Sequence, residues 1–294
     1  MKTQTAARPK TASLLDWRYR YRNIPYYVFL ILFSLITILI FLWLVESSFK
    51  TNREVFGNVW AIPATPLKAA LTNYTKAWNL SHMSIYFANS LIVTLFAVLL
   101  VVLIAAPAAY ALSRVNFPGN AFVTYYFIAG LGLPYQLILV PLFVMLTQLH
   151  LANTLQGLIL TYVGVSVPFT IMLLTSFFRT LPTELEDAGA IDGCSEFEIF
   201  WKVMMPLAGP GIFTAAIFNF VSMWNEFLLA KLIVNNDALK TLPLGVMSIR
   251  SSMQYTADWS GLFAAVVIVI IPNFIAYLLF SDRIMAGLTL GSSR

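Results

Sequence analysis

Long apolar stretches alternate with short charged stretches along the chain. No residue between Arg22 and Glu46 is charged, and the same is true between Arg114 and Arg179. A helix needs about 20 apolar residues to cross a bilayer, so the first window holds one span and the second holds two. The pattern predicts an all-α polytopic membrane protein with six transmembrane helices, at about 24–45, 85–113, 120–147, 157–178, 207–234 and 260–281.

Polar residues and prolines subdivide the longest apolar window. The polar run from Gln148 to Gln156 marks the cut between the third and fourth spans. Pro134 and Pro141 fall inside the third span and Pro168 inside the fourth, where neighbouring helices can satisfy the carbonyls that a proline frees. These prolines indicate kinks, which either act as hinges or only help the helices to pack.

Basic residues set the predicted orientation. Residues 1–23 are polar and basic and are expected to form a cytoplasmic tail, while residues 24–294 form the transmembrane domain. If the N-terminus is inside, eight of the ten arginines lie in the cytoplasm, as the positive-inside rule requires. We therefore expect a multi-pass protein of the cell membrane with both its N- and C-termini in the cytoplasm.

A charged segment between the fourth and fifth spans, residues 181–206, is called the elbow here. Thr183 with Glu186, and Ser195 with Glu198, match the capping-box pattern that starts a helix. Gly193 separates the two helices, because glycine adopts the left-handed turn that closes the first, and Pro206 is expected to end the second. The elbow has an apolar side and an acidic side, so it predicts a docking surface.

Composition excludes several classes of function. The chain is 59% hydrophobic and 11% charged, whereas a soluble domain has about 25% charged residues. The net charge of +5 gathers in the N-terminal tail, which gives no indication of nucleic-acid binding. The single Cys194 excludes an internal disulfide framework, and His82 and His150 lie too far apart to indicate a metal site. No phosphate-binding Gly-Lys pair and no catalytic constellation occurs, so we expect neither an enzyme nor a cofactor in this chain.

Three polar or amphipathic residues inside the fifth span are candidates for a transport pathway. Glu226 is an acid within a span and therefore indicates function, although near the outer end it could also reach water. Trp224 and Asn225 offer an aromatic face and an amide group, which suit a ligand that carries hydroxyl groups. The alternative for Asn225 and Trp224 is hydrogen bonding between helices, which is common for such side chains in membranes.

The elbow resembles the EAA loop of ABC importer permeases. That loop reads roughly E-A-A-x-x-D-G-A, then Phe, Leu-Pro-Leu and a later Pro; here residues 187–194 read D-A-G-A-I-D-G-C, followed by Phe200, Met205-Pro206-Leu207 and Pro210. Asp187 keeps the charge of the usual Glu, Gly189 replaces Ala and allows close approach to a partner, and Cys194 replaces Ala. Short segments at 47–50, 89–91, 108–114, 117–119, 224–227 and 287–289 are similar to the maltose-permease G-subunit branch.

The resemblance implies a type I ABC importer permease fold and a permease subunit that moves a sugar, a di- or oligosaccharide, or a related solute. Its partners would be a second homologous permease, two ATP-binding cassette subunits that hold ATP and Mg, an extracytoplasmic solute-binding protein and the bilayer. The elbow would be the coupling loop that enters a cleft of the ATPase. Its implied coupling residues are Glu184, Asp187, Ala188, Gly189, Asp192, Gly193, Phe200 and Pro206.

The loop before the last span is the expected contact with the binding protein. Tyr255 and Trp259 are its aromatic candidates, because aromatic side chains anchor interfaces. They would equally suit an aromatic belt at the membrane surface. A permease for glycerol 3-phosphate or another polyol remains an alternative, which the acid Glu226 disfavours for a phosphate ester. A self-contained secondary transporter would be expected to show two matching halves, and the sequence shows no such repeat.

Overall fold

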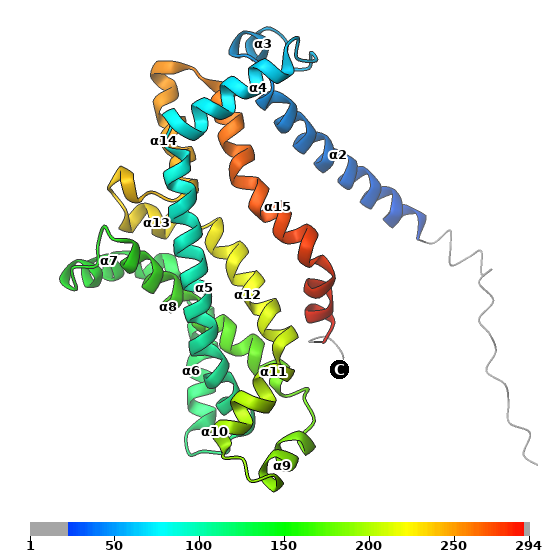
Figure 1. Cartoon of the computed structure of the whole chain (residues 1–294), viewed down its shortest axis with the longest axis vertical. Helices are drawn as coiled ribbons and strands as arrows, with labels where there is room; N and C mark the ends of the chain where they lie inside the picture. The colour runs from blue at the N-terminus through cyan, green and yellow to red at the C-terminus, as the bar shows by residue number, and fades with distance from the viewer. Residues whose placement is uncertain (1–22, 291–294) are drawn as a thin grey trace, which may run out of the picture.

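The computed structural model describes the backbone of residues 23–290, and in that range it also describes the side chains except those of residues 80, 253–256 and 282–290. The described part is helical and contains no strand (Figure 1). The predicted basic tail lies outside the described residues, except for Asn23. The elements in chain order are α2 (Ile24–Ser48), α3 (Asn52–Gly57), α4 (Pro66–Thr75), η1 (Lys76–Leu80), α5 (Met83–Arg114), α6 (Asn120–Gly132), η2 (Tyr135–Ile138), α7 (Leu139–Gln148), α8 (Leu155–Phe178), α9 (Glu184–Ile191), α10 (Glu196–Glu198), η3 (Ile199–Met204), α11 (Met205–Leu207), α12 (Gly209–Trp224), α13 (Leu228–Ile233), η4 (Asp237–Leu239), α14 (Leu242–Thr256) and α15 (Trp259–Leu290).

Four helices are long and apolar enough to cross a membrane unbroken: α2, α5, α8 and the part of α15 from Trp259 to Ser281. They match the first, second, fourth and sixth predicted spans. The backbone of α15 continues as helix to Leu290, well past the predicted end at residue 281. The other two spans are pairs of helices with a sharp bend between them, so the described chain has six spans when each bent pair counts as one.

The third predicted span breaks at Pro134. Helix α6 ends at Gly132, and the segment Tyr135–Gln148 leaves it at 89°. Leu133 has an extended backbone, which is the conformation that a following proline imposes on its neighbour. Pro141 lies in the first turn of α7, where its missing N–H costs little, and Pro168 lies inside the continuous α8. The kink interpretation is therefore confirmed at Pro134.

The fifth span ends ten residues earlier than predicted. Helix α12 stops at Trp224 instead of residue 234, and a separate short helix, α13, begins at Leu228. The carboxylate of Glu226 causes this restart, because it accepts hydrogen bonds from the backbone N–H groups of Leu229 and Ala230. At its other end the span bends by 72° at Ala208. Pro206 lies within the helical segment α11 and does not end the second elbow helix as predicted.

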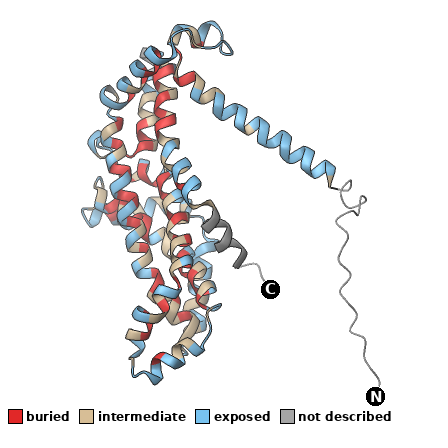
Figure 2. Cartoon of the chain, turned by 45° about the vertical axis from the view of Figure 1, so that its right-hand side comes forward, coloured by how far each residue is buried: buried red, intermediate tan, exposed pale blue. Residues whose placement is uncertain are grey.

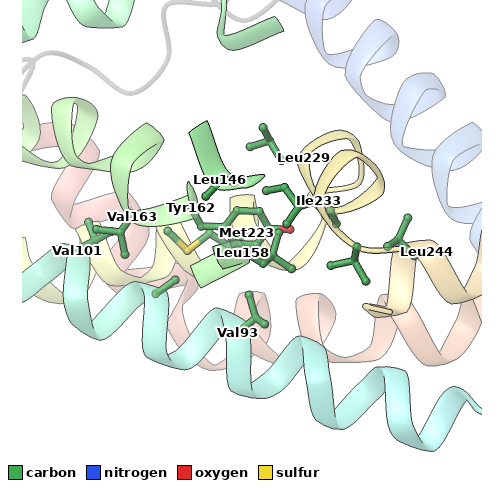
Figure 3. Close-up of a cluster of buried hydrophobic side chains, with 13 residues drawn as sticks. Val93, Val101, Leu146, Leu158, Tyr162, Val163, Met223, Leu229, Ile233 and Leu244 are labelled. Atoms are coloured by element: carbon green, nitrogen blue, oxygen red, sulfur yellow. The ribbon is translucent and has the colours of Figure 1, made fainter. Parts of the chain in front are cut away.

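The core lies between α5, α8 and α12. Four alanines on α5, Ala97, Ala105, Ala106 and Ala109, are fully buried, which lets the backbones of α5 and α8 approach closely. Large side chains fill the space around Tyr162 and Met223 in one cluster that links α5, α8, α12 and α13 (Figure 3). Helix α2 stands away from this core: the structure buries Ser47 and Ser48 at its end, and its apolar side chains are exposed (Figure 2).

The segment between α2 and α5 covers the end of the bundle opposite α9 (Figure 1). Lys50 anchors it: its fully buried amine donates to the carbonyl oxygen of Val59 at 2.7 Å and lies 3.0 Å from the carboxylate of Glu46. The side chain of Asn73 donates to the carbonyl oxygens of Ser48 and Lys50. The segment 46–84, which joins the first two predicted spans, thus holds local helical structure, with α3, α4 and η1 in it.

Candidate coupling site and transport pathway

The elbow folds as two helical pieces joined by a left-handed turn. Gly193 has a φ of +81°, and the backbone N–H of Cys194 donates to the carbonyl oxygen of Gly189 at 3.0 Å. Such a turn at a glycine closes a helix by satisfying its last carbonyls. The prediction that Gly193 separates two helices is therefore confirmed, and the elbow lies at the far end of the bundle from the α3–α4 segment (Figure 1).

One of the two predicted capping boxes forms. Ser195 accepts from the backbone N–H of Glu198, whose carboxylate accepts in return from the N–H of Ser195, and Lys202 donates to Glu198 at 2.8 Å. Thr183 caps nothing with its side chain, because its backbone is already helical. The side chain of Glu186 is instead directed toward Arg114, so the prediction of a Thr183–Glu186 box was wrong.

Helix α9 exposes most of its predicted coupling residues. The outward set consists of two acids of its first turn, two small or apolar residues and the acid after its end: Glu184, Asp187, Ala188, Ile191 and Asp192. Ile191 is 86% exposed, which is unusual for an isoleucine at the end of a helix. An exposed apolar side chain flanked by carboxylates presents both apolar area and hydrogen-bond acceptors to a partner.

Two predicted coupling residues face their own chain instead. Gly189 is buried, and a Cβ atom there would lie 3.1 Å from Cγ1 of Ile199, so its close approach is to the second elbow helix and not to a partner. Phe200 is 4% exposed and packs against the rings of Tyr110 and Trp201. Phe200 therefore belongs to the core that the elbow shares with α5 and α8, while Pro206 is exposed.

Arg114, at the end of α5, was not singled out from the sequence as a site residue. One terminal nitrogen of its guanidinium donates to the carbonyl oxygens of Phe178, at 2.5 Å, and Leu181. Its Nε lies 3.8 Å from Oε1 of Glu186. The sequence did contain a signal for this residue. Arg114 is a lone basic residue at the end of a charge-free span, four residues before Pro118, and Glu186 is an acid at the start of a later helix.

Trp224 and Asn225, two of the pathway candidates in the fifth span, differ in their exposure and in their contacts. Trp224 is 1% exposed, donates from Nε1 to the carbonyl oxygen of Val269 at 3.0 Å and stacks on Phe220. Its assignment to the pathway surface is therefore wrong, because its ring fills the space between α12 and α15. Asn225 is exposed and exchanges amide hydrogen bonds with Asn273 of α15, at 2.9 and 3.3 Å, which is the helix-bridging role held as its alternative.

Glu226 is fixed by protein groups. Its Oε1 accepts from the N–H of Leu229 at 2.8 Å, and its Oε2 accepts from the N–H of Ala230 at 3.0 Å and from the hydroxyl of buried Tyr162 at 2.9 Å. The carboxylate thus caps α13 and joins it to α8. Glu226 is half-buried, so both interpretations of this acid, a functional group and a side chain that reaches water, stay predictions.

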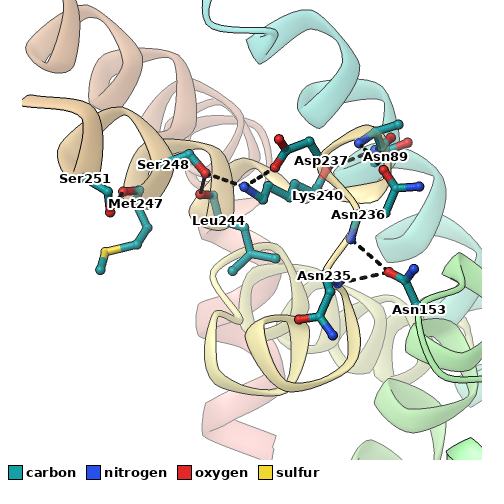
Figure 4. A network of polar contacts seen from close by, with 11 residues as sticks. Asn89, Asn153, Asn235, Asn236, Asp237, Lys240, Leu244, Met247, Ser248 and Ser251 are labelled. Carbon is teal, nitrogen blue, oxygen red and sulfur yellow. Dashed lines mark hydrogen bonds and ion pairs between the residues drawn. The ribbon is translucent and has the colours of Figure 1, made fainter. Parts of the chain in front are cut away.

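The loop expected before the last span, between the predicted spans 207–234 and 260–281, is largely helix α14. Amide side chains hold its first part in place (Figure 4): Asn89 donates to the carbonyl oxygens of Ala238 and Lys240, and Asn153 accepts from the backbone N–H groups of Asn235 and Asn236. The side chain of Tyr255 lies outside the described residues, although its backbone is in α14. Trp259 begins α15, is 41% exposed and lies 6.4 Å from the ring of Phe263.

Among the described residues, no group of three or more metal-ligating side chains comes together. The structure therefore offers two regions with functional character: the exposed face of α9, and the polar residues where α12 gives way to α13. Both lie at breaks in the helices, where a chain can change direction without disturbing the core.

Comparison with known proteins adds evidence from sequence and fold. Residues 101–281 match the family model of the binding-protein-dependent transport system inner membrane component. The diacetylchitobiose uptake system permease protein NgcG of Streptomyces coelicolor is 40% identical over 90% of this chain and 87% of its own length. The trehalose/maltose transport system permease protein MalG of Thermococcus litoralis is 32% identical over 89% of this chain and 93% of its own length.

A solved structure with a similar fold is a bacterial ABC transporter involved in the import of the acidic polysaccharide alginate. Its matching chain has a TM-score of 0.78, covers 95% of this chain and 99% of its own length, and is 21% identical. This likeness confirms the ABC importer permease fold. Since the family model matches more than half of the residues and relatives match nearly the whole length, the chain belongs to the family of binding-protein-dependent transport system inner membrane components, which are membrane transport subunits and not enzymes.

Proposed function

We propose that this chain is one of two permease subunits of an ATP-driven importer and that α9 is its coupling helix. The observation that carries the proposal is the outward face of α9, where exposed Ile191 lies among the carboxylates of Asp187 and Asp192 at one end of an apolar bundle. An apolar side chain of this kind suits a cleft in a partner, and the carboxylates suit charge-assisted hydrogen bonds to basic groups around it.

The partner at this face would be an ATP-binding cassette subunit, one of two in the complex. This chain has no Gly-Lys phosphate loop in its sequence, so ATP and Mg would be held by those subunits. The other permease would be a homologue that covers the exposed apolar surface of the bundle. A solute-binding protein outside the membrane would deliver the solute, which fits the family's description as a component of a binding-protein-dependent transport system.

This arrangement requires the elbow on the cytoplasmic side. The basic tail 1–23 and both ends of the chain would then also be cytoplasmic, and α14 would face the outside. A cysteine at position 236 should react with an impermeant thiol reagent in intact cells in which Cys194 is replaced by Ser. A cysteine at position 293 should react only after the membrane is opened, and its labelling in intact cells would contradict the orientation.

The solute we favour is a di- or oligosaccharide, because two relatives that match along most of the chain are named for diacetylchitobiose and for trehalose or maltose. Exposed Asn225 and half-buried Asn273 add amide groups that can bind hydroxyl groups. Uptake of labelled disaccharides by proteoliposomes that hold the complete complex tests this. Uptake of glycerol 3-phosphate or another polyol, with no response to any saccharide, would favour the alternative.

Co-purification distinguishes an importer subunit from a self-contained transporter. Affinity capture of this chain from membranes that express the neighbouring transport genes should bring down a second permease and an ATP-binding subunit. Solute uptake by this chain alone in vesicles without ATP would contradict the importer and favour a secondary transporter or channel.

A further inference from the structure

Helix α9 turns one carboxylate away from its exposed face. The side chain of Glu186 is 20% exposed, whereas the next residue, Asp187, lies on the outward face. Oε1 of Glu186 lies 3.8 Å from Nε of Arg114, the last residue of α5, whose side chain is 10% exposed. An acid in the first turn suits the helix macrodipole, and this one also faces a basic side chain of a membrane span.

Arg114 connects three parts of the chain at this point. It belongs to α5, and it donates to the carbonyl oxygens of Phe178 and Leu181, where α8 ends. Its remaining contact is with Glu186 of α9. A guanidinium group is suited to such a junction, because its planar set of donors can serve two carbonyls and a carboxylate together.

Arg114 and Glu186 lie too far apart for a hydrogen bond between Nε and Oε1. A charge-assisted N–H···O bond has a length of about 2.7–2.9 Å. At 3.8 Å, Nε of Arg114 and Oε1 of Glu186 are buried without a hydrogen-bond partner among the described atoms. Buried charged atoms without a partner are unfavourable, so the pair favours a small inward movement of α9 that would close the gap.

Helix α9 also packs against the rest of the elbow, and its Glu186 lies near the hydroxyl group of Tyr110 on α5 as well as near Arg114. Gly189 packs against Ile199, and the N–H of Cys194 donates to the carbonyl oxygen of Gly189. Of the ion pairs between described residues, Arg114–Glu186 is the one that joins α9 to a membrane span. The pair therefore lies on a direct polar route from the docking face to α5 and α8, which form the most extensive helix–helix contact among the described elements.

We propose that Arg114 and Glu186 are positioning residues that make α5 and α8 move with α9 when the ATPase moves. The proposal rests on the proposed function, in which α9 docks on an ATP-binding subunit. Pressure on the outward face brings Glu186 toward Arg114, and the closed pair pulls on the ends of both spans. Without the pair, α9 still docks, but its movement is taken up by the short non-helical join at 179–183 and less of it reaches the pathway.

A double-mutant cycle on the complete complex in proteoliposomes tests the pair. The variants are Glu186→Gln, which keeps the size of the side chain, Arg114→Gln and the combination. Three quantities are measured: ATPase subunits retained, ATP hydrolysed, and solute transported per ATP. We expect full retention, a fall of about fivefold or more in solute transported per ATP for each single variant, and no further fall for the combination.

A matched control removes a neighbouring arginine that makes no ion pair with a described residue. Arg179 follows α8 and is exposed, so Arg179→Gln should leave the ratio of solute to ATP unchanged. Arg114→Lys keeps a cation for the two carbonyls. It should transport more solute per ATP than Arg114→Gln, and it can be measured even if Arg114→Gln does not assemble. A purely structural pair would lower hydrolysis and transport together.

Two results would overturn the proposal: an unchanged ratio in Glu186→Gln, or single effects that multiply in the combination. Loss of the ATPase subunits from the wild-type complex under the same conditions would overturn the proposed function, on which the role of the pair rests. Retention measured before transport separates these two failures.

Discussion

Gly245 of α14 lies against the ring of Tyr86 of α5 so closely that a Cβ atom at position 245 would be 2.2 Å from Cδ2 of that ring. The same Cβ would be 3.1 Å from the sulfur of Met83. Asn89 and Ser90, one turn further along α5, hold the backbone that leads into α14. The first turns of α5 are therefore fixed to α14, while its other end carries Arg114.

Gly245→Ala should destabilise this contact. The methyl group has no room without a shift of the Tyr86 ring, and overpacking of this kind costs about 1–3 kcal/mol. We expect a lower Tm for the purified complex and a weaker response of ATP hydrolysis to the liganded binding protein. Gly164→Ala in α8 is the control, because nothing lies within 4 Å of the added Cβ there. Equal Tm values for the two variants would contradict the close packing.

Glu226→Gln should weaken the contact between α13 and α8 and lower the thermal stability of the protein. A carboxylate can accept from Leu229, Ala230 and Tyr162 at once, whereas an amide places an N–H₂ group against one of these donors. An unsatisfied buried donor costs about 1–3 kcal/mol, so thermal unfolding should begin at a lower temperature.

Tyr162→Phe measures how much of the stability lost in Glu226→Gln comes from the hydrogen bond of the Tyr162 hydroxyl group. The combination of Tyr162→Phe with Glu226→Gln should lose less than the sum of the two single variants, because both remove the same bond. Strict additivity of the Tm changes would show that the two side chains act independently.

The sequence was sufficient for the long spans and insufficient for the breaks. Charge-free windows located α2, α5 and α8 because a bilayer requires an unbroken apolar length. Pro134 predicted the break of the third span, because proline disfavours a helical conformation at the residue before it. The break after Trp224 has no proline or glycine. It depends on hydrogen bonds that the backbone N–H groups of Leu229 and Ala230 donate to the carboxylate of Glu226, a pairing that the pattern of apolar residues does not encode.

The same limit applies to the candidate site. Gly193 was predictable because a left-handed turn has one strongly preferred residue. Phe200 and Trp224 were misplaced because periodicity gives the residues that share a face but not the element that this face meets. Glu186 was assigned to a capping box by local spacing, whereas Arg114, distant in sequence, determines where its side chain points.

Asn225→Ala should alter transport more than stability. The amide of Asn225 is exposed and bridges α12 to Asn273, so its removal leaves an amide that water can reach. Exposed hydrogen bonds of this kind contribute about 1 kcal/mol or less to folding. If the amide contacts the solute, the concentration of saccharide for half-maximal uptake should rise by about fivefold or more.

Trp224→Phe is the contrasting variant. It keeps an aromatic ring in the core but loses the bond to the carbonyl oxygen of Val269, so we expect a lower Tm and unchanged solute preference. An unchanged uptake curve for Asn225→Ala would remove Asn225 from the pathway and leave it as a bridge between helices.

Tyr255→Ala tests the outer helix α14 as a contact for the binding protein. A buried aromatic anchor at an interface is worth about 2 kcal/mol or more, so the binding-protein concentration for half-maximal stimulation of ATP hydrolysis should rise by about tenfold or more. Trp259→Ala should have a smaller effect on this concentration and a larger effect on Tm, because its ring packs against Phe263. If both residues belong to a membrane-surface belt, neither variant will change the response to the binding protein.

Gly193→Val tests whether the turn of the elbow positions α9 for docking. Valine is strained at a φ of +81°, and the cost of such a backbone is about 1–2 kcal/mol. There is open space around the position, so the effect comes from the backbone and not from a clash. We expect the permease pair to insert and to stay folded, because the core around Phe200 holds the second elbow helix in place.

The expected defect of Gly193→Val is specific. A shifted α9 should lose ATPase subunits during purification, or allow ATP hydrolysis without uptake. Gly193→Asn is the matched control, since asparagine tolerates the left-handed conformation better than valine and should keep most of the activity. A rival interpretation places the elbow on the membrane surface as an amphipathic segment; it predicts weaker membrane integration with the ATPase still bound. Full retention of ATPase subunits together with normal uptake in Gly193→Val would defeat the assignment of α9 as the coupling helix.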